Sequence, residues 1–206
     1  GLTMSPVNVV TREGLPSLFV QDIPPTTNTD LSLPRAEIYY GELTNQYIIV
    51  NGSSEEFDYP EGDKNQYTNY VGSGGIGIGG LIDRALFSAY FGDVELILSN
   101  YVTEDSRVLF RRNIKERVEH LVPFLYFDSD PYLVLEGDTM VWMLDGYTTT
   151  RDYPYAEPTN GGRFNYIRNS VKVVIDAYNG DVAFYVSDEA DPMIQVYQKV
   201  FPETFK

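Results

Sequence analysis

The chain has 206 residues, of which 43% are hydrophobic and 22% charged, proportions typical of a folded globular protein. Acidic residues outnumber basic ones by 30 to 15, and the net charge of −15 argues against nucleic-acid partners, because phosphate binding needs a positive surface. The absence of cysteine excludes disulfides and thiolate chemistry. Since no run of about 18 apolar residues occurs, this segment is not expected to insert directly into a membrane.

The N-terminal region is predicted to be an extended arm. Residues 1–34 are rich in proline and show little hydrophobic periodicity, so we interpret them as an arm in front of a single α+β domain over residues 35–206. The side chains expected to pin this arm to the domain are apolar: Leu18, Phe19, Val20 and Ile23.

The next two segments differ in their patterning. Residues 35–51 alternate well enough to predict a hairpin that turns around residues 43–45. Residues 53–71 are polar and rich in Tyr, Asp and Gly, and we interpret them as a long surface loop.

A glycine-rich stretch follows at residues 72–80, with the pattern G-x-G-x-x-G at Gly72, Gly74 and Gly77. A phosphate-binding turn with this pattern requires a buried strand before it and a helix after it. The preceding "KNQYTNYV" is too polar for a buried strand. Close backbone packing ahead of a helix is therefore favoured over phosphate binding.

Helices are predicted over about residues 78–122. One begins at Leu81, breaks near Gly92-Asp93 and resumes to Leu98, and a second extends from an N-cap at Thr103 to about Leu121. The second helix would carry Arg107 and Arg111 at the edge of its apolar stripe. We expect both to pair with carboxylates, with Asp128 and Asp130 as candidates, although arginines that extend to solvent are an alternative.

Two hairpins and a terminal helix complete the predicted fold. Residues 132–145 form a hairpin that turns at Gly137-Asp138, and residues 170–187 form another at Asn179-Gly180. With a two-residue turn, Tyr178 faces Asp181, and Val173 and Phe184 share one wholly apolar face. Asp191-Pro192 starts a helix that ends near residue 200. The fold class is α+β: an antiparallel sheet built from β-hairpins, with helices over about 78–122 and 191–200 packed on it.

The candidate ligand site lies in the connection over residues 146–169, which is long for a compact domain. Arginines gathered beside aromatic side chains in an acidic protein indicate either an anionic-ligand patch or internal struts. Struts are favoured, because arginines in acidic proteins are most often paired. The candidate ligand-binding residues are Arg151, Tyr153, Tyr155, Arg163, Asn165 and Arg168.

No catalytic residue, metal site or cofactor is predicted. His120 is the only histidine, so a zinc site or a histidine-based triad lacks its components. Calcium ligands are available in Asp128 with Asp130, or in the acidic group at residues 188–191, but neither spacing fits an EF-hand loop. Solvated acids or helix caps are the commoner explanation.

Several stretches of the chain resemble one family of bacterial proteins. They include "IYYGELTNQYIIVN", "SRVLFRRNIKERV", "PFLYFDSDPYLV" and "NYIRNSVKVVIDAYNGDVAFYV". The chain from about Leu15 onward is similar to a family of large multi-spanning membrane proteins catalogued as an uncharacterised protein family. The resemblance implies several N-terminal membrane spans followed by a large region on the extracytoplasmic face of the bacterial cell membrane, to which this chain would belong. The implied partners are the membrane-spanning part of the same protein and components of the cell envelope.

Three functional hypotheses follow. The first is an extracytoplasmic, non-catalytic module of an integral membrane protein with a binding or structural role. The second is a hydrolase or transferase that acts on cell-envelope glycan or peptide through Asp/Glu and Tyr side chains, which requires two carboxylates about 5–9.5 Å apart. The third is a nucleotide-binding domain that uses residues 72–80.

Overall fold

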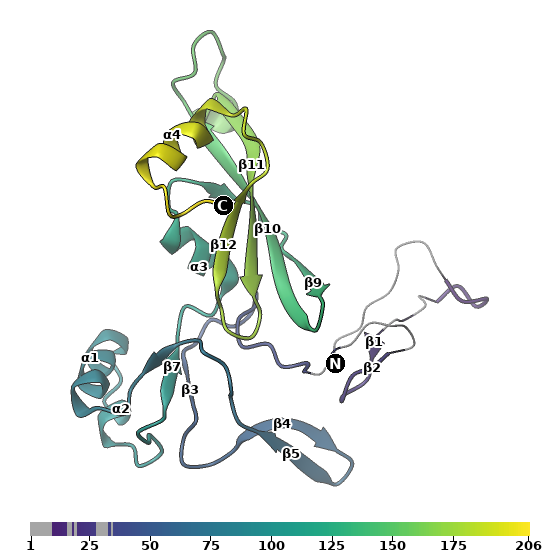
Figure 1. The fold of residues 1–206 in the computed structure, drawn as a ribbon, viewed down its shortest axis with the longest axis vertical. Coiled ribbons are helices and arrows are strands. Elements are labelled where there is room, and N and C mark those ends of the chain that lie inside the picture. The colour runs from purple at the N-terminus through teal and green to yellow at the C-terminus, as the bar shows by residue number, and fades with distance from the viewer. Residues whose placement is uncertain (1–9, 16–17, 19, 28–32, 34) are drawn as a thin grey trace. The chain divides into compact units, whose positions relative to one another are not determined.

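A computed structural model of the chain describes residues 10–15, 18, 20–27, 33 and 35–206. The chain forms two compact units whose segments alternate along the sequence. The small-sheet unit comprises residues 1–39, 46–110 and 135–139, and the long-hairpin unit comprises residues 40–45, 111–134 and 140–206. Antiparallel sheets and short helices make up both units, which confirms the predicted α+β class (Figure 1). The division into an arm over 1–34 and a single domain over 35–206 stays a prediction.

The long-hairpin unit is built on one five-stranded antiparallel sheet. Its strands are β8 (Tyr126–Phe127), β9 (Tyr132–Glu136), β10 (Thr139–Thr150), β11 (Tyr166–Asp176) and β12 (Val182–Val186). The end of β9 and the first residue of β10, within residues 135–139, are grouped with the small-sheet unit. The order is β12-β11-β10-β8, and β9 also pairs with β10. The predicted hairpin over residues 132–145 is therefore confirmed, and its second strand continues five residues further than expected, to Thr150.

The hairpin of β11 and β12 has the predicted apolar face but a different turn. Ile175 pairs with Val182, so the turn contains the four residues 177–180 instead of two. Asp176 closes this turn, because its carboxylate accepts the Tyr178 and Asn179 amides at 2.7 and 2.9 Å. The register differs from the predicted one by two residues, and since side chains alternate with period two, the same side chains still face the core. Three of the β11 residues, at positions 171, 173 and 175, have no exposed surface, and Phe184 is 5% exposed.

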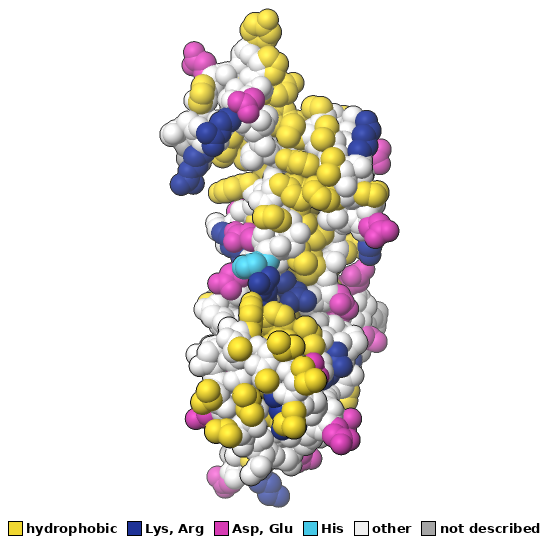
Figure 2. Space-filling view, turned by 90° about the vertical axis from the view of Figure 1, so that its left-hand side faces the viewer, with side chains coloured by type: hydrophobic (Ala, Val, Ile, Leu, Met, Phe, Trp, Pro, Cys, Tyr) yellow, Lys and Arg dark blue, Asp and Glu magenta, His cyan; other side chains and the backbone are white. Residues whose placement is uncertain are grey.

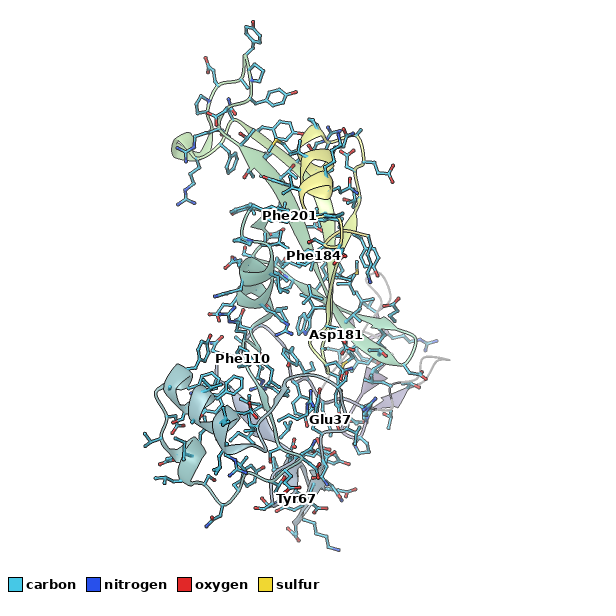
Figure 3. The ribbon with its side chains drawn as sticks, turned by 60° about the vertical axis from the view of Figure 1, so that its left-hand side comes forward. Glu37, Tyr67, Phe110, Asp181, Phe184 and Phe201 are labelled. Carbon is cyan, nitrogen blue, oxygen red and sulfur yellow. The ribbon has the colours of Figure 1, made fainter. Side chains whose placement is uncertain are left out.

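Two helices complete the core of this unit. They are α3 (Ile114–Leu121), capped by the side chain of Asn113, and α4 (Pro192–Val200), capped by that of Asp191 as predicted. Aromatic contacts join the ends of the two helices. The Phe124 ring stacks on Phe201 at 4.9 Å, and Phe205 lies 6.3 Å from Phe184 (Figure 3 labels Phe184 and Phe201).

The small-sheet unit contains β3 (Ile48–Val50), β6 (Ile76–Gly77) and β7 (Arg107–Leu109) in the order β3-β7-β6. Two predictions are wrong here. Residues 35–51 do not form a hairpin, because β3 pairs with β7. The helix predicted from Thr103 is a strand in its first half, because long-range pairing outweighs local helical periodicity. The helix itself begins only after Asn113.

Helices α1 (Leu81–Phe91) and α2 (Glu95–Leu98) pack on this small sheet. The break at Gly92 confirms the predicted interruption. The buried core of the small-sheet unit is a cluster of aliphatic side chains that aromatic rings surround. The fully or nearly buried members are Ile78, Leu96, Val102 and Val108, with Tyr47, Ile49, Phe87, Phe91 and Phe110 packed against them.

Two further hairpins belong to the small-sheet unit. The predicted loop over residues 53–71 contains β4 (Glu56–Glu61) paired with β5 (Lys64–Thr68), so that prediction is wrong. These strands escaped the sequence pattern because they carry few apolar residues. In the arm, β1 (Val20–Gln21) pairs with β2 (Thr26–Thr27). Val20 is buried as expected and Leu18 is half-buried, whereas Ile23 is 41% exposed and Phe19 lies outside the described residues.

Within the described part of the chain, no helix has the length and apolar character needed to cross a membrane.

Candidate functional site

The connection that holds the predicted ligand residues is shorter than expected. Because β10 ends at Thr150 and β11 begins at Tyr166, only residues 151–165 are irregular, apart from a 3-10 turn at residues 160–162. This connection caps a hairpin whose register extends from Val141 paired with Asp176 to Thr150 paired with Tyr166. The loop is therefore presented at the end of two long, paired strands.

Two of the six candidate residues hold this loop together. The Tyr153 ring stacks on Tyr166 with a centroid distance of 4.8 Å and an interplanar angle of 20°. The side chain of Asn165 accepts the Tyr153 amide at 2.9 Å and donates to the Tyr153 carbonyl at 2.8 Å. It also donates to the Ala156 carbonyl at 3.1 Å. Tyr153 and Asn165 thus have a structural role that sequence spacing did not reveal.

The three arginines among the candidate residues have different surroundings. Arg168 Nε lies 2.5 Å from Asp188 Oδ2. Its hydrogen bond with Tyr166, together with the attraction of Asp188, raises the pKa of the Arg168 guanidinium. This geometry matches the internal-strut interpretation for Arg168. Arg151 and Arg163 are exposed, as is Tyr155, whose backbone φ is 61°. Ligand binding by these three residues stays a prediction.

A buried carboxylate joins the strands of this hairpin to α4. Asp191 has no exposed surface. Its Oδ2 accepts the hydroxyls of Thr148 and Ser170, both at 2.5 Å. Its Oδ1 accepts the Tyr166 hydroxyl at 2.6 Å and the Met193 amide at 2.9 Å. The sequence revealed the cap but not the three hydroxyls, because they come from β10 and β11, 21 to 43 residues away.

The surroundings of Asp191 keep it ionised. Burial by itself raises the pKa of the Asp191 carboxyl, but the hydrogen bonds from Ser170, Thr148, Tyr166 and the Met193 amide outweigh it, and the pKa is lowered. A carboxylate with four donors around it is poorly placed to exchange protons with a substrate. Asp191 is therefore a structural anchor.

The glycine-rich stretch is held from within the small-sheet unit. Arg107 donates to the carbonyls of Ser73, Gly74 and Gly75 at 2.9, 2.7 and 2.8 Å. Backbone carbonyls of its own unit therefore take several donors of Arg107, and the predicted pairing of Arg107 and Arg111 with Asp128 or Asp130 stays a prediction. A Cβ at Gly75 would lie 2.4 Å from the Leu109 side chain. This close approach supports backbone packing as the role of the stretch.

The most distinctive surface of the small-sheet unit is the side of α1 and α2 that faces away from its core. We call it the outer face. Figure 2 shows hydrophobic side chains gathered on the side of the molecule that these helices occupy. Seven large apolar side chains within 18 residues are between 40% and 77% exposed: Leu81, Ile82, Leu86, Tyr90, Val94, Ile97 and Leu98.

The inner side of the same helices is partly polar. Ser88 is the buried residue of α1, and Arg84 donates to the carbonyls of Ile78 and Val102 at 3.2 and 2.9 Å. Tyr47 donates its hydroxyl to Asp93 in the turn before α2, and burial together with this bond raises the pKa of Tyr47 to about 12. The sequence predicted an apolar helix at this place. It did not predict that Arg84 and Ser88 would lie on the inner side while Leu86 is exposed.

A small recess lies elsewhere in the small-sheet unit. Its volume is about 150 Å³, and its lining includes Pro24, Arg35, Glu37, Asp58 and Tyr59. Glu37 Oε2 is buried and accepts no hydrogen bond from the described residues (Figure 3). Among the described residues, no group of three or more His, Cys, Asp or Glu side chains is arranged to hold a metal ion.

Comparison with known proteins places the chain in a family. The model of an uncharacterised protein family, UPF0182, matches residues 1–206. A UPF0182 protein of Pelotomaculum thermopropionicum is 52% identical over 206 residues, which cover the whole chain and 22% of that relative. UPF0182 proteins of Cupriavidus necator and Bradyrhizobium diazoefficiens are 52% and 49% identical and are covered to 23% and 22%.

No solved structure matches the chain. The chain spans less than a quarter of the length of these relatives, so it corresponds to part of a larger protein. On the match along its full length, the chain belongs to the uncharacterised protein family UPF0182.

Proposed function

We propose that the chain is a non-catalytic, extracytoplasmic module of a larger bacterial membrane protein, in which it has a binding or structural role. The observation that carries this proposal is the outer face of α1 and α2. A large exposed group of apolar side chains on a soluble protein commonly marks an interaction site. Leu86 and Leu98, at 64% and 76% exposed, are typical of this surface.

The free energy of burying these side chains also favours an interaction site. Full burial of a Leu, Ile or Val side chain contributes about 1.5–3 kcal/mol, so covering several partly exposed ones would contribute on the order of 5–10 kcal/mol. Scattered single exposures are ordinary in soluble proteins and need no partner. Seven in 18 consecutive residues form a surface that favours association.

The polar side chains support a structural role over a catalytic one. Asp191 accepts four hydrogen bonds from the protein itself, and the guanidinium groups of Arg84 and Arg107 donate to backbone carbonyls. These groups are used to fix loops and helix ends.

The second candidate is a hydrolase or transferase acting on cell-envelope glycan or peptide. The recess beside Glu37 favours it, because Asp58 and Tyr59 line the same space. Its volume of about 150 Å³ is smaller than the roughly 300–1,000 Å³ of ordinary ligand pockets, which places this candidate second. Turnover of an envelope glycan or peptide that is lost in Glu37→Gln would favour the enzyme over the module.

The extracytoplasmic location can be tested by cysteine labelling of the full-length protein. The chain contains no cysteine, so Asp138→Cys, in the exposed turn between β9 and β10, introduces one reporter into this region once cysteines elsewhere in the protein are replaced. We expect a membrane-impermeant maleimide to label this residue in intact cells. Labelling only after the cells are lysed would contradict the proposal.

A further inference from the structure

The outer face has a composition that narrows the choice of partner. Its centre is aliphatic, and the acidic residues exposed among residues 81–98 are Asp83 and Glu95. Arg84 is the one basic residue in that stretch, and its guanidinium donates to backbone carbonyls on the inner side. The exposed side chains of α1 and α2 are thus mainly apolar, and the charged ones among them are acidic.

This charge pattern disfavours two occupants. Helices that lie on a membrane surface usually carry Lys and Arg on their polar side, which attract anionic lipid headgroups. Here the exposed charges are acidic, and the chain as a whole has a net charge of −15. A second copy bound through this face would add its own Asp83 and Glu95 to an interface without an exposed basic residue from 81–98, and like charges across an interface oppose association.

A third possible occupant is another segment of the same polypeptide, and neither objection applies to it. The chain covers only 22% of one relative and 23% of another, so most of the protein lies outside these residues. A segment tethered to the chain is present at an effective concentration in the millimolar range, and it therefore covers an apolar surface without high intrinsic affinity.

We infer that the outer face of α1 and α2 is covered by a segment of the same polypeptide from outside residues 1–206, apolar at its centre and basic or uncharged at its margins. This inference rests on the proposed role as a module of a larger protein and names the partner of that surface. It assigns α1 and α2 to an intramolecular contact.

Site-directed photocrosslinking in the full-length protein tests the inference. With p-benzoylphenylalanine at Leu86, 64% exposed in the chain alone, we expect a product of monomer mass, with the crosslinked peptide mapping outside residues 1–206. The matched control places the same group at Val200 on α4, which is 60% exposed, and we expect it not to give that product. A crosslinked dimer, a lipid adduct or no crosslink at Leu86 would each overturn the inference.

A substitution within the outer face provides an independent readout. With the photoreactive group at Tyr90, Leu86→Asp is expected to lower the yield of the intramolecular product about tenfold, because it places a charge in an apolar contact. Val200→Asp is the control and should leave the yield unchanged. An unchanged yield in Leu86→Asp would contradict the inference.

These results are separable from the test of the proposed function. If the maleimide labels Asp138→Cys only in lysed cells, the extracytoplasmic location fails while the intramolecular contact can still be present. If the location holds but Leu86 crosslinks to a second copy or to lipid, only the choice of occupant fails.

Discussion

The two units of the molecule use their helices in opposite ways. In the long-hairpin unit, α3 and α4 have side-chain caps at Asn113 and Asp191, and their residues Ile114, Val118 and Ile194 have no exposed surface. In the small-sheet unit, α1 begins at Gly80 without a side-chain cap and buries Ser88. The helices of the first unit therefore bury aliphatic side chains in its core, although Val196 and Val200 of α4 are exposed. The second presents an exposed apolar surface on α1 and α2, which we infer is covered by another part of the protein.

The sheets of the two units differ in the length over which their strands pair. Strands β10 and β11 pair over ten positions, with a shift between Gly146 and Tyr147, whereas β3 pairs with β7 over three. The long hairpin has enough paired length to bury a continuous apolar face. The short sheet supplies a small cluster around Ile78 and Val108 that covers only the inner side of α1 and α2. Substitutions that separate these two kinds of core test the comparison.

The largest loss of stability is expected from Gly180→Ala, at the turn between β11 and β12. Gly180 has φ +77°, and an added Cβ would lie 2.5 Å from the Tyr40 ring. Backbone strain and overpacking together should lower the free energy of unfolding by about 3–5 kcal/mol. Denaturant unfolding measures this difference.

A second turn glycine provides the control for that measurement. Gly137 has φ +61°, but an added Cβ would have no neighbour within 4 Å. Gly137→Ala should therefore cost only the backbone strain, about 1–2 kcal/mol. Equal losses in the two variants would show that the contact between Gly180 and Tyr40 is unimportant.

The next largest effect should distinguish two neighbouring residues of α2. Leu96 is 2% exposed and belongs to the small core, whereas Ile97 is 40% exposed on the outer face. In the isolated chain, Leu96→Ala is expected to lower the free energy of unfolding by about 2–4 kcal/mol, and Ile97→Ala by under about 1 kcal/mol. Thermal or denaturant unfolding of both variants checks this. A larger loss in Ile97→Ala would mean that the outer face is already covered within the chain.

A smaller effect is expected when the buried anchor of the long-hairpin unit is changed. Asp191→Asn keeps the shape of the side chain but removes the charge that three hydroxyls and the Met193 amide bind. The loss of charged hydrogen bonds should lower the free energy of unfolding by about 1–3 kcal/mol. Unfolding at neutral pH measures it, and an unchanged stability would contradict the anchoring role.

The same anchor predicts a pH dependence. The pKa of Asp191 is lower in the folded chain than in the unfolded chain, where an aspartate has a pKa of about 3.9. The contribution of Asp191 to stability is therefore fully present above that pH and is lost as pH falls through the lower, folded pKa. The wild-type chain should lose stability below about pH 4 more steeply than Asp191→Asn. Parallel curves would exclude this carboxylate as the cause.

The smallest effect should come from the arginines of the β10–β11 connection. Arg168→Ala removes an ion pair with Asp188 that is partly exposed to solvent, so we expect a slight decrease in melting temperature that added salt diminishes. Arg151→Ala, at an exposed position, should leave the melting temperature unchanged. If instead both variants keep their stability and lose binding to an anionic envelope fragment, the ligand-patch interpretation would replace the strut.

The parts of the fold that sequence predicted are those set by neighbours along the chain. The place of the hairpin around Asn179-Gly180, though not its turn length, the helix start at Asp191-Pro192 and the break at Gly92 each depend on a few adjacent residues. The missed parts depend on distant partners. Residues 107–109 have a helical period but pair with β3, and Thr103, expected to cap a helix, donates its hydroxyl to the Asn51 carbonyl at 3.0 Å.

The sequence predicted the helix that carries the outer face but not the orientation of that helix. Its apolar helix could be predicted from composition, but Arg84 and Ser88 had no local signal that would place them inward. The position of Arg84 follows from the carbonyls of Ile78 and Val102 that it reaches, which come from separate segments. The orientation of an amphipathic helix is read from its apolar side, and α1 is apolar on both sides.

The most direct test of the intramolecular contact is the rate at which a thiol reagent reaches the outer face in the full-length protein. Leu86→Cys and Val200→Cys introduce reporters at positions that are 64% and 60% exposed in the chain alone. The account predicts that the cysteine at position 86 reacts at least about tenfold more slowly than the one at 200, since a covering segment must first leave. Equal rates at the two positions would show that nothing covers α1 and α2, and would contradict the account.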